Sequence, residues 1–397
     1  MRITQSLLQT QFLASLNTLE SNLATTQNQI STGLAFTTPA QNPAAAGTVN
    51  TYTQVLSQSQ QYTTNATSAQ SNLNVEDNAL TQVQNQLQTL RSLALEANSG
   101  TLSSQDFSAL ASQASQIQQT LVGLANTQNG NGEYVFAGYA AQSQPFAQTA
   151  SGASYAGDQG QRSVQIGAGQ TIAIGDNGNA VFNQIPNGNG SFTVTANPAN
   201  TGTGLVGAST VTDPAAYAAG RYTIAFTSPT SYQVLDAANT VVASGTYTSG
   251  QAIAFAGVQV SLSGQPATGD SFAIAPSANQ SLFTTVQNFI GTLNSAASGG
   301  MNSTQLSNAI ATTLGALDQA SSHVSTVQAG VGGRLNQITT QLSIDSSQQT
   351  QLQQSISTLQ SLDYPSAITS LTNQQTTLSA SMQAYTLTAG LSLFKYI

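Results

Sequence analysis

Both ends of this chain carry apolar residues at the alternating spacings of four and three that mark the seam of a coiled coil. The N-terminal seam comprises Phe12, Leu16, Leu19, Leu23, Thr26 and Ile30. The C-terminal seam comprises Ile368, Leu371, Gln375, Leu378, Met382, Tyr385 and Ala389. A helix with one apolar stripe must bury that stripe against another element. Two such seams at opposite ends of one chain therefore predict that the two ends fold against each other.

The residues that follow the first seam predict where its helix ends. Gly33 suits a helix C-terminus, and Pro39 and Pro43 prevent one continuous helix. The next apolar patterns predict a second long helix over residues 43–98 and a third over residues 105–126. The N-terminal third of the chain is therefore expected to be almost entirely helical.

Between about residues 132 and 276 the pattern changes. Short runs such as "GSFTVTA" and "RYTIAFTS" alternate apolar with polar residues, and Gly, Asn, Asp or Pro separate them. The stretch "DAANTVVASG" joins two of these runs in the manner of a hairpin. We predict an antiparallel β domain here, with helix again from about residue 278 and with Pro365 in the first turn of the last helix.

These patterns predict an α+β fold. Its main body is a long helical rod, an antiparallel coiled-coil bundle built from both the N- and C-terminal regions, with the antiparallel β domain inserted at the tip. The expected domains are residues 1–42 and 360–397 as terminal coiled-coil assembly helices, residues 43–140 and 278–359 as the helical rod domain, and residues 141–277 as the outer β domain.

Charged residues make up only 5% of the chain, against roughly a quarter in ordinary globular proteins. A surface with so little charge repels its own copies weakly, which favours tight packing of identical subunits. Six basic residues and a net charge of −8 argue against a nucleic-acid partner. No stretch has the roughly 18 apolar residues of a membrane span, and the first residues lack the features of a cleaved secretory signal. We therefore predict no nucleic-acid partner, no membrane partner and no cleaved signal peptide.

Few residues are candidates for chemistry, and the chain has no cysteine. The one histidine, His323, stands beside Ser321 and Ser322, but neighbouring positions on a helix point apart. Glu76 and Asp77 are expected either to interact with a helix N-terminus or to form part of a solvated face. We predict no catalytic, cofactor-binding or metal-binding residues and no enzymatic activity.

Two short Gly- and Asp-containing stretches, "DQGQ" (158–161) and "GDNGN" (175–179), faintly resemble calcium loops. They lack the further carboxylates of a strong site, so hairpin turns are the better explanation. Two of the six basic residues, Arg91 and Arg334, are candidates for ion pairs across helices or across subunits. Simple solvation of these two side chains explains the sequence equally well.

The two ends are nearly uncharged, since residues 1–60 carry only Arg2 and Glu20. Isolated helices are marginal in water, so we expect both ends to be partly disordered in the free subunit and ordered by neighbouring subunits. An ordinary coiled-coil hairpin within the monomer is the alternative. The predicted assembly interface consists of Phe12, Leu16, Leu19, Leu23, Ile30, Leu371, Leu378, Met382, Tyr385, Leu391, Leu393, Phe394 and Ile397.

Several stretches resemble the flagellin superfamily, the axial proteins of bacterial flagella. They are "ISTGLAFTTPAQNPAAAGTV" (30–49), "DNALTQVQNQLQTLRSLALEANSGT" (77–101), "VGGRLNQI" (331–338), "LDYPSAITSL" (362–371) and the closing helix. Together these blocks cover roughly residues 1–140 and 315–397. One departure is that the family commonly has an acidic residue where this chain has Gln41 and Asn42.

Within that superfamily, "GEYVFAGYAAQSQPF" (132–146), "YAGDQGQRSVQIGAGQTIAIGDNGNAVF" (155–182) and the ending "GLSLFKYI" resemble the hook-associated protein 3 family, which forms the hook–filament junction. The resemblance implies a non-enzymatic adaptor located in the extracellular flagellum, with hook-associated protein 1, flagellin and copies of itself as partners. It also implies a dedicated export chaperone and the flagellar type III export apparatus. A flagellin or another axial filament protein is the nearest alternative, and a surface adhesin is a more distant one.

The assembly hypothesis predicts fast amide hydrogen exchange at both ends of the monomer, because the seams there are completed only by other subunits. Exchange measured by mass spectrometry on monomer should show low protection over the first and last 30 or so residues. Strong protection of both ends in the monomer would contradict the hypothesis.

Overall fold

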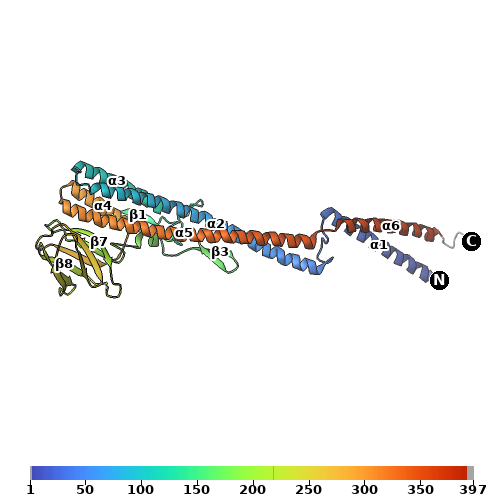
Figure 1. Cartoon of the computed structure of the whole chain (residues 1–397). Coiled ribbons are helices and arrows are strands. Elements are labelled where there is room, and N and C mark those ends of the chain that lie inside the picture. The colour runs from blue at the N-terminus through green and yellow to red at the C-terminus, as the bar shows by residue number, and fades with distance from the viewer. Residues whose placement is uncertain (1, 218, 391–397) are drawn as a thin grey trace, which may run out of the picture. The chain divides into compact units, whose positions relative to one another are not determined.

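The structure of the protein is a computed structural model that describes residues 2–217 and 219–390. Helices at both ends of the chain enclose a run of strands in the sequence order, as the blue-to-red colouring shows (Figure 1). The chain divides into two compact units, a first unit of residues 1–64 with 341–397 and a second unit of residues 65–340. The predicted α+β class, with helical terminal regions and an inserted antiparallel β domain, is confirmed.

The helices are α1 (Arg2–Thr32), α2 (Pro43–Ala97), α3 (Ser104–Ala125), α4 (Leu282–Ala297), α5 (Ser303–Gln360) and α6 (Tyr364–Gly390). The starts and ends of α2 and α3 differ by one residue at most from the predicted 43–98 and 105–126. Gly33 follows α1 with φ of +72°, a left-handed conformation that favours glycine. At the start of α3, Ser103 and Asp106 bond each other's backbone N–H in a capping box.

The strands are β1 (Phe146–Thr149), β2 (Gly152–Tyr155), β3 (Ser163–Gly167), β4 (Gln170–Ala173), β5 (Ile185–Pro186), β6 (Phe192–Ala196), β7 (Leu205–Val211), β8 (Tyr222–Ser228), β9 (Ser231–Asp236), β10 (Val241–Thr246), β11 (Ala252–Phe255), β12 (Val258–Ser263), β13 (Ser271–Pro276) and β14 (Asn279–Gln280). A π-helical turn, η1 (Asn179–Asn183), lies between β4 and β5. The predicted hairpin over "DAANTVVASG" is present as the antiparallel pair of β9 and β10.

Two antiparallel sheets share one core in the β domain. The five-stranded sheet has the order β10-β9-β8-β13-β6, and the three-stranded sheet has the order β11-β12-β7. Buried side chains of both sheets form one cluster, for example Ile224 and Phe272 from the first and Val260 and Leu262 from the second. The alternation of apolar and polar residues along each strand places one face of each sheet in this core.

A separate aromatic core lies where the β region meets α3 and α4 in the second unit. Phe146, at the start of β1, is fully buried, and its ring centroid lies 5.0 to 5.5 Å from those of Tyr155, Phe182 and Phe283. Phe182 in turn packs edge-on against Phe136 at 5.1 Å. These rings join β1, η1 and α4 into one packed cluster.

The first unit has a smaller apolar core. Phe36, Ala46 and Val49 are buried, with Ile356 and Leu359 of α5 packed against them. Further along the same helix pair the contact is polar, since Gln349 of α5 donates to the hydroxyl oxygens of Ser59 and Thr63 of α2. Among the described residues, every helix is either too short or too polar to span a bilayer.

We expect Phe146→Ala to lower the free energy of unfolding by about 3–5 kcal/mol, because it removes a ring from the centre of the aromatic core. Chemical denaturation followed by circular dichroism measures the change. Tyr139→Ala is the control, since that side chain is 67% exposed and its removal should cost under about 0.5 kcal/mol. Equal effects of the two substitutions would show that the Phe146 cluster does not hold this unit together.

Candidate assembly surface

Helices α1 and α6 form an antiparallel pair in the first unit. Near its open end the rings of Phe12 and Tyr385 stack with centroids 5.0 Å apart and planes 9° apart. At the other end Leu34 and Ser361 form an antiparallel bridge. α1 and α6 therefore lie side by side from the Leu34–Ser361 bridge to the Phe12–Tyr385 stack (Figure 1).

The N-terminal seam lies where the heptad pattern predicts. Phe12, Leu16, Leu19, Leu23 and Ile30 are all half-buried on a helix that contacts α6. Burial is only partial because one neighbouring helix can cover only part of each side chain. The structure thus brings these candidates together, while their role in assembly stays a prediction.

The C-terminal seam is rotated from the predicted one. Leu371, Leu378 and Tyr385 are half-buried as expected, whereas Met382 is 47% exposed and Ile368 is 52% exposed. The intervening half-buried or buried positions are Ala367, Gln374 and Ser381. The prediction that Ile368 and Met382 continue the seam is therefore wrong. Residues 371, 378 and 385 fit either of two seams, one that continues through Ile368 and Met382 and one that continues through Ala367, Gln374 and Ser381. Packing against α1 selects the second seam, which has the smaller side chains at residues 367 and 381.

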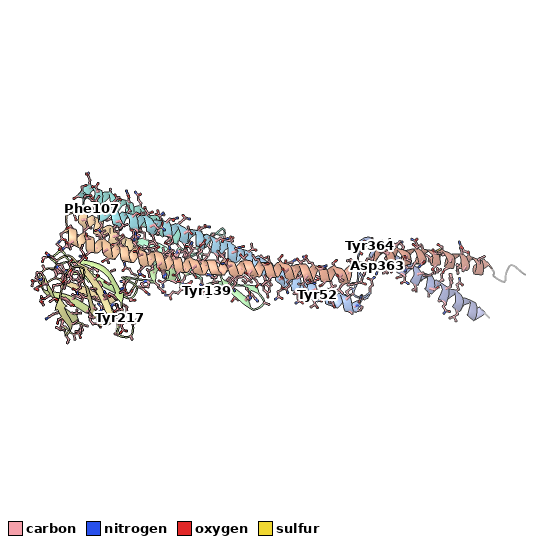
Figure 2. The ribbon with its side chains drawn as sticks, in the orientation of Figure 1. Tyr52, Phe107, Tyr139, Tyr217, Asp363 and Tyr364 are labelled. Carbon is pink, nitrogen blue, oxygen red and sulfur yellow. The ribbon has the colours of Figure 1, made fainter. Side chains whose placement is uncertain are left out.

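Large apolar side chains remain exposed on this helix pair. They are Leu7, Leu13, Tyr364, Ile368, Met382 and Leu387, exposed by 47% to 71%. Figure 2 shows Tyr364 beside Asp363 at the start of α6. The other four predicted interface residues, Leu391, Leu393, Phe394 and Ile397, lie outside the described residues.

The turn between α1 and α2 forms without acidic side chains. The side-chain oxygen of Gln41 accepts the backbone N–H of Thr37 at 2.6 Å, and that of Asn42 accepts the N–H of Ala45 at 3.1 Å, at the start of α2. Neutral amide oxygens thus provide the capping that carboxylates can provide at such positions.

In the second unit the two candidate arginines lie in different environments. Arg91 of α2 pairs with Asp318 of α5 at 2.9 Å, but the two side chains are 48% and 55% exposed, so the pair adds little stability. Arg334 of α5 pairs with Asp176, and these side chains are only 16% and 19% exposed. A third pair, Arg162 with Glu133 at 3.0 Å, has no signal in the sequence beyond the two charges.

Glu76 is fully buried, so the prediction that it belongs to a solvated face or a helix N-terminus is wrong. Its Oε1 accepts the backbone N–H of Asp176 at 3.1 Å, and its Oε2 has no partner among the described residues. Burial and the neighbouring Asp176 carboxylate raise the pKa of Glu76 well above its usual value, while Arg334 opposes them. Helical periodicity gives no hint of this contact, since Asp176 comes from a distant loop.

The remaining chemical candidates are structural. The Nε2 atom of His323 lies 2.8 Å from the carbonyl oxygen of Ala180, and because a carbonyl only accepts, this nitrogen carries the donated proton. The prediction that "DQGQ" and "GDNGN" are hairpin turns is wrong. The first joins the separate β1–β2 and β3–β4 hairpins, and the second leads from β4 into η1. The described residues contain no group of three or more His, Asp or Glu side chains placed to hold a metal ion.

Comparison with known proteins places these features in a family. Residues 3–141 match the bacterial flagellin N-terminal helical region, and residues 195–276 match the D2-like domain of flagellar hook-associated protein 1. The crystal structure of flagellar hook-associated protein 3 from Legionella pneumophila is 31% identical, with a TM-score of 0.72. That likeness covers 78% of this chain and 98% of the Legionella chain. The chain belongs to the hook-associated protein 3 family.

Two further relatives carry the same family name or its synonym, FlgL. The flagellar junction protein FlgL of Legionella pneumophila is 32% identical over 74% of this chain and 99% of that chain, with a TM-score of 0.67. Flagellar hook-associated protein 3 of Salmonella typhimurium is 32% identical over 185 residues, which are 47% of this chain. The match to the Salmonella protein spans 58% of that relative's length.

We expect Glu76→Gln to stabilise this hook-associated protein 3 family member in a pH-dependent way. A carboxyl group whose pKa is higher in the folded than in the unfolded state binds its proton more tightly when folded. Its favourable contribution is therefore complete below the unfolded pKa and is lost as pH rises through the folded pKa.

Glutamine is neutral at every pH, so the variant should match the wild type near pH 4 and exceed it by about 1–3 kcal/mol at pH 8. Urea unfolding at the two pH values measures the difference. Asp77→Asn, one residue further along the helix, is the matched control and should show no comparable gain. A constant offset of Glu76→Gln at both pH values would contradict the argument.

Proposed function

We propose that this protein is a structural, non-enzymatic subunit of the bacterial flagellum. It acts as the adaptor at the hook–filament junction that joins hook-associated protein 1 to the flagellin filament. The terminal helix pair α1–α6 is its assembly surface, and the β domain is its outer part. In this proposal residues 1–42 and 360–397 make the assembly contacts, residues 43–140 and 278–359 form the supporting helical body, and residues 141–277 form the outer domain.

The observation that carries this proposal is the exposed apolar surface of the terminal helix pair in a family of junction proteins. Leu7, Leu13, Met382 and Leu387 are large side chains exposed by 47% or more on helices that hold each other by only one seam. Exposed apolar side chains gathered on one element favour a protein interface. With only Arg2 and Glu20 as charges on α1, identical copies can pack there with little repulsion.

The partners follow from the same comparisons. The match of residues 3–141 to the flagellin helical region supports side-by-side packing with flagellin and with copies of itself. The match of residues 195–276 to a domain of hook-associated protein 1 supports a place next to that protein in the flagellum. Export through the flagellar type III apparatus with a dedicated chaperone, and an extracellular location, complete the proposal.

Flagellin is the second candidate, because the match over residues 3–141 is to the flagellin helical region. A solved hook-associated protein 3 at 31% identity and a solved flagellar junction protein FlgL at 32% identity favour the junction role over the filament role. The two functions differ in one measurable property, since a flagellin polymerises into long filaments of its own.

The proposal predicts that Met382→Ser weakens assembly without unfolding the monomer. The substitution removes an apolar contact of about 1 kcal/mol per subunit interface, and this loss repeats at every copy. Cells carrying the variant as their only source of this protein should secrete it normally but build fewer filaments, counted by electron microscopy. Thermal melting of the monomer should change little.

Val242→Ser is the matched control, because Val242 lies on β10 of the β domain and is also 47% exposed. This variant should build normal filaments. If Met382→Ser also builds normal filaments, α6 is not the assembly surface. If the purified wild-type protein grows long filaments alone, the junction role gives way to the flagellin role.

A further inference from the structure

Helix α5 contains an unusual concentration of glycine in its interior. Three of the four residues from 330 to 333 are glycine, namely Gly330, Gly332 and Gly333, within a continuous helix of 58 residues (Figure 1). Glycine is the weakest helix former apart from proline, because it loses the most backbone freedom on folding. This one turn is therefore a weak point in the backbone of α5.

Close packing does not explain these glycines. A Cβ atom placed at any of the three would have no atom of the described residues within 4 Å beyond the local helix backbone. Gly152 is a contrasting case, since a Cβ there would lie 2.6 Å from the carbonyl oxygen of Phe283. Alanine would fit at 330, 332 and 333 and would favour the helix, so the glycines weaken the helix without any steric gain in the subunit.

The same turn borders an open hollow on the surface of the second unit. A hollow of about 520 Å³ is lined by Gly330 and Arg334 together with His323 of α5, and by Asp176 and Ala180 on the facing side. Atoms that line an open hollow face solvent instead of packing partners, so they resist displacement less than a close-packed interior does. α5 therefore has room to move at the point where its backbone is weakest.

A polar contact holds this turn to the rest of the second unit. Arg334 directly follows the glycines and pairs with Asp176, whose backbone N–H is in turn held by the buried Glu76 of α2. On either side of the turn, Val324 and Ile338 are fully buried and anchor the flanking helix. The half-buried ion pair is thus the principal polar tie between the glycine turn and the loop that faces it.

We propose that residues 330–333 are a bend point in α5 and that the Arg334–Asp176 ion pair, supported by Glu76, is the latch that keeps this turn straight. The helix then changes curvature by opening a few backbone hydrogen bonds at the glycines while the buried residues on both sides keep their contacts. Helix kinks occur at such glycine positions, and hinges are short segments that absorb the backbone change. This inference concerns the subunit itself and is independent of the junction role.

Amide hydrogen exchange of the full-length protein tests the bend point directly. Amides of residues 331–337 should exchange through local openings, so their exchange rates should depend weakly on urea. Neighbouring α5 amides should exchange only when a larger part of the unit unfolds, so their exchange rates should depend strongly on urea. Replacing Gly330, Gly332 and Gly333 together by alanine should slow their exchange by up to about 100-fold. Each Gly→Ala change favours the helix by about 1 kcal/mol, and every 1.4 kcal/mol changes an equilibrium constant tenfold. The three changes together therefore give a factor of about 100. Gly291→Ala, at an equally open helical glycine of α4, should leave exchange of residues 331–337 unchanged.

The latch is tested by Asp176→Asn, which should speed exchange of residues 331–337 selectively. Asp318→Asn is the matched control, because it removes the other ion pair of α5, which lies more than a dozen residues away. Circular dichroism melting checks that each variant is folded. The proposal is overturned if residues 331–337 exchange only with global unfolding in the wild type, or if Asp176→Asn and Asp318→Asn have the same effect on them.

Discussion

The first unit depends on the contact between α1 and α6, two helices from opposite ends of the chain. The seam between them is mostly apolar and almost without charge, and most of its residues are half-buried rather than buried. A pair of helices leaves most of each surface in water, so it gains less from burial than a bundle of three or four does. This shortage of burial, together with the exposed leucines and Met382, is the physical reason for assigning the remaining apolar surface to other subunits.

The second unit is stabilised differently. It has closed cores, one of aromatic rings around Phe146 and one between the two sheets of the β domain. Its few charges are used locally, since Arg91, Arg162 and Arg334 each pair with an acidic residue of the same unit. Half of the six basic residues of the chain therefore form ion pairs within this unit.

Much of the fold follows from local pattern. The ends of α2 and α3, the β9–β10 hairpin and the break after Gly33 were predictable, because proline, glycine and the apolar periods act within a few residues. The turn at Gln41 and Asn42 forms with amide oxygens as its caps. Contacts between distant segments were less predictable. Nothing near Glu76 in sequence indicates that Asp176 and Arg334 will surround it.

The sequence by itself determined the main helical regions, the β region and the pairing of the two chain ends, because hydrophobic period and helix-breaking residues are local properties. The tertiary structure alone decided which face of α6 meets α1, so that Ser381 is inside and Met382 outside. It also decided that Glu76 is buried. Both outcomes depend on the shape and charge of a neighbour far away in the sequence, and a one-dimensional pattern carries no information about that neighbour.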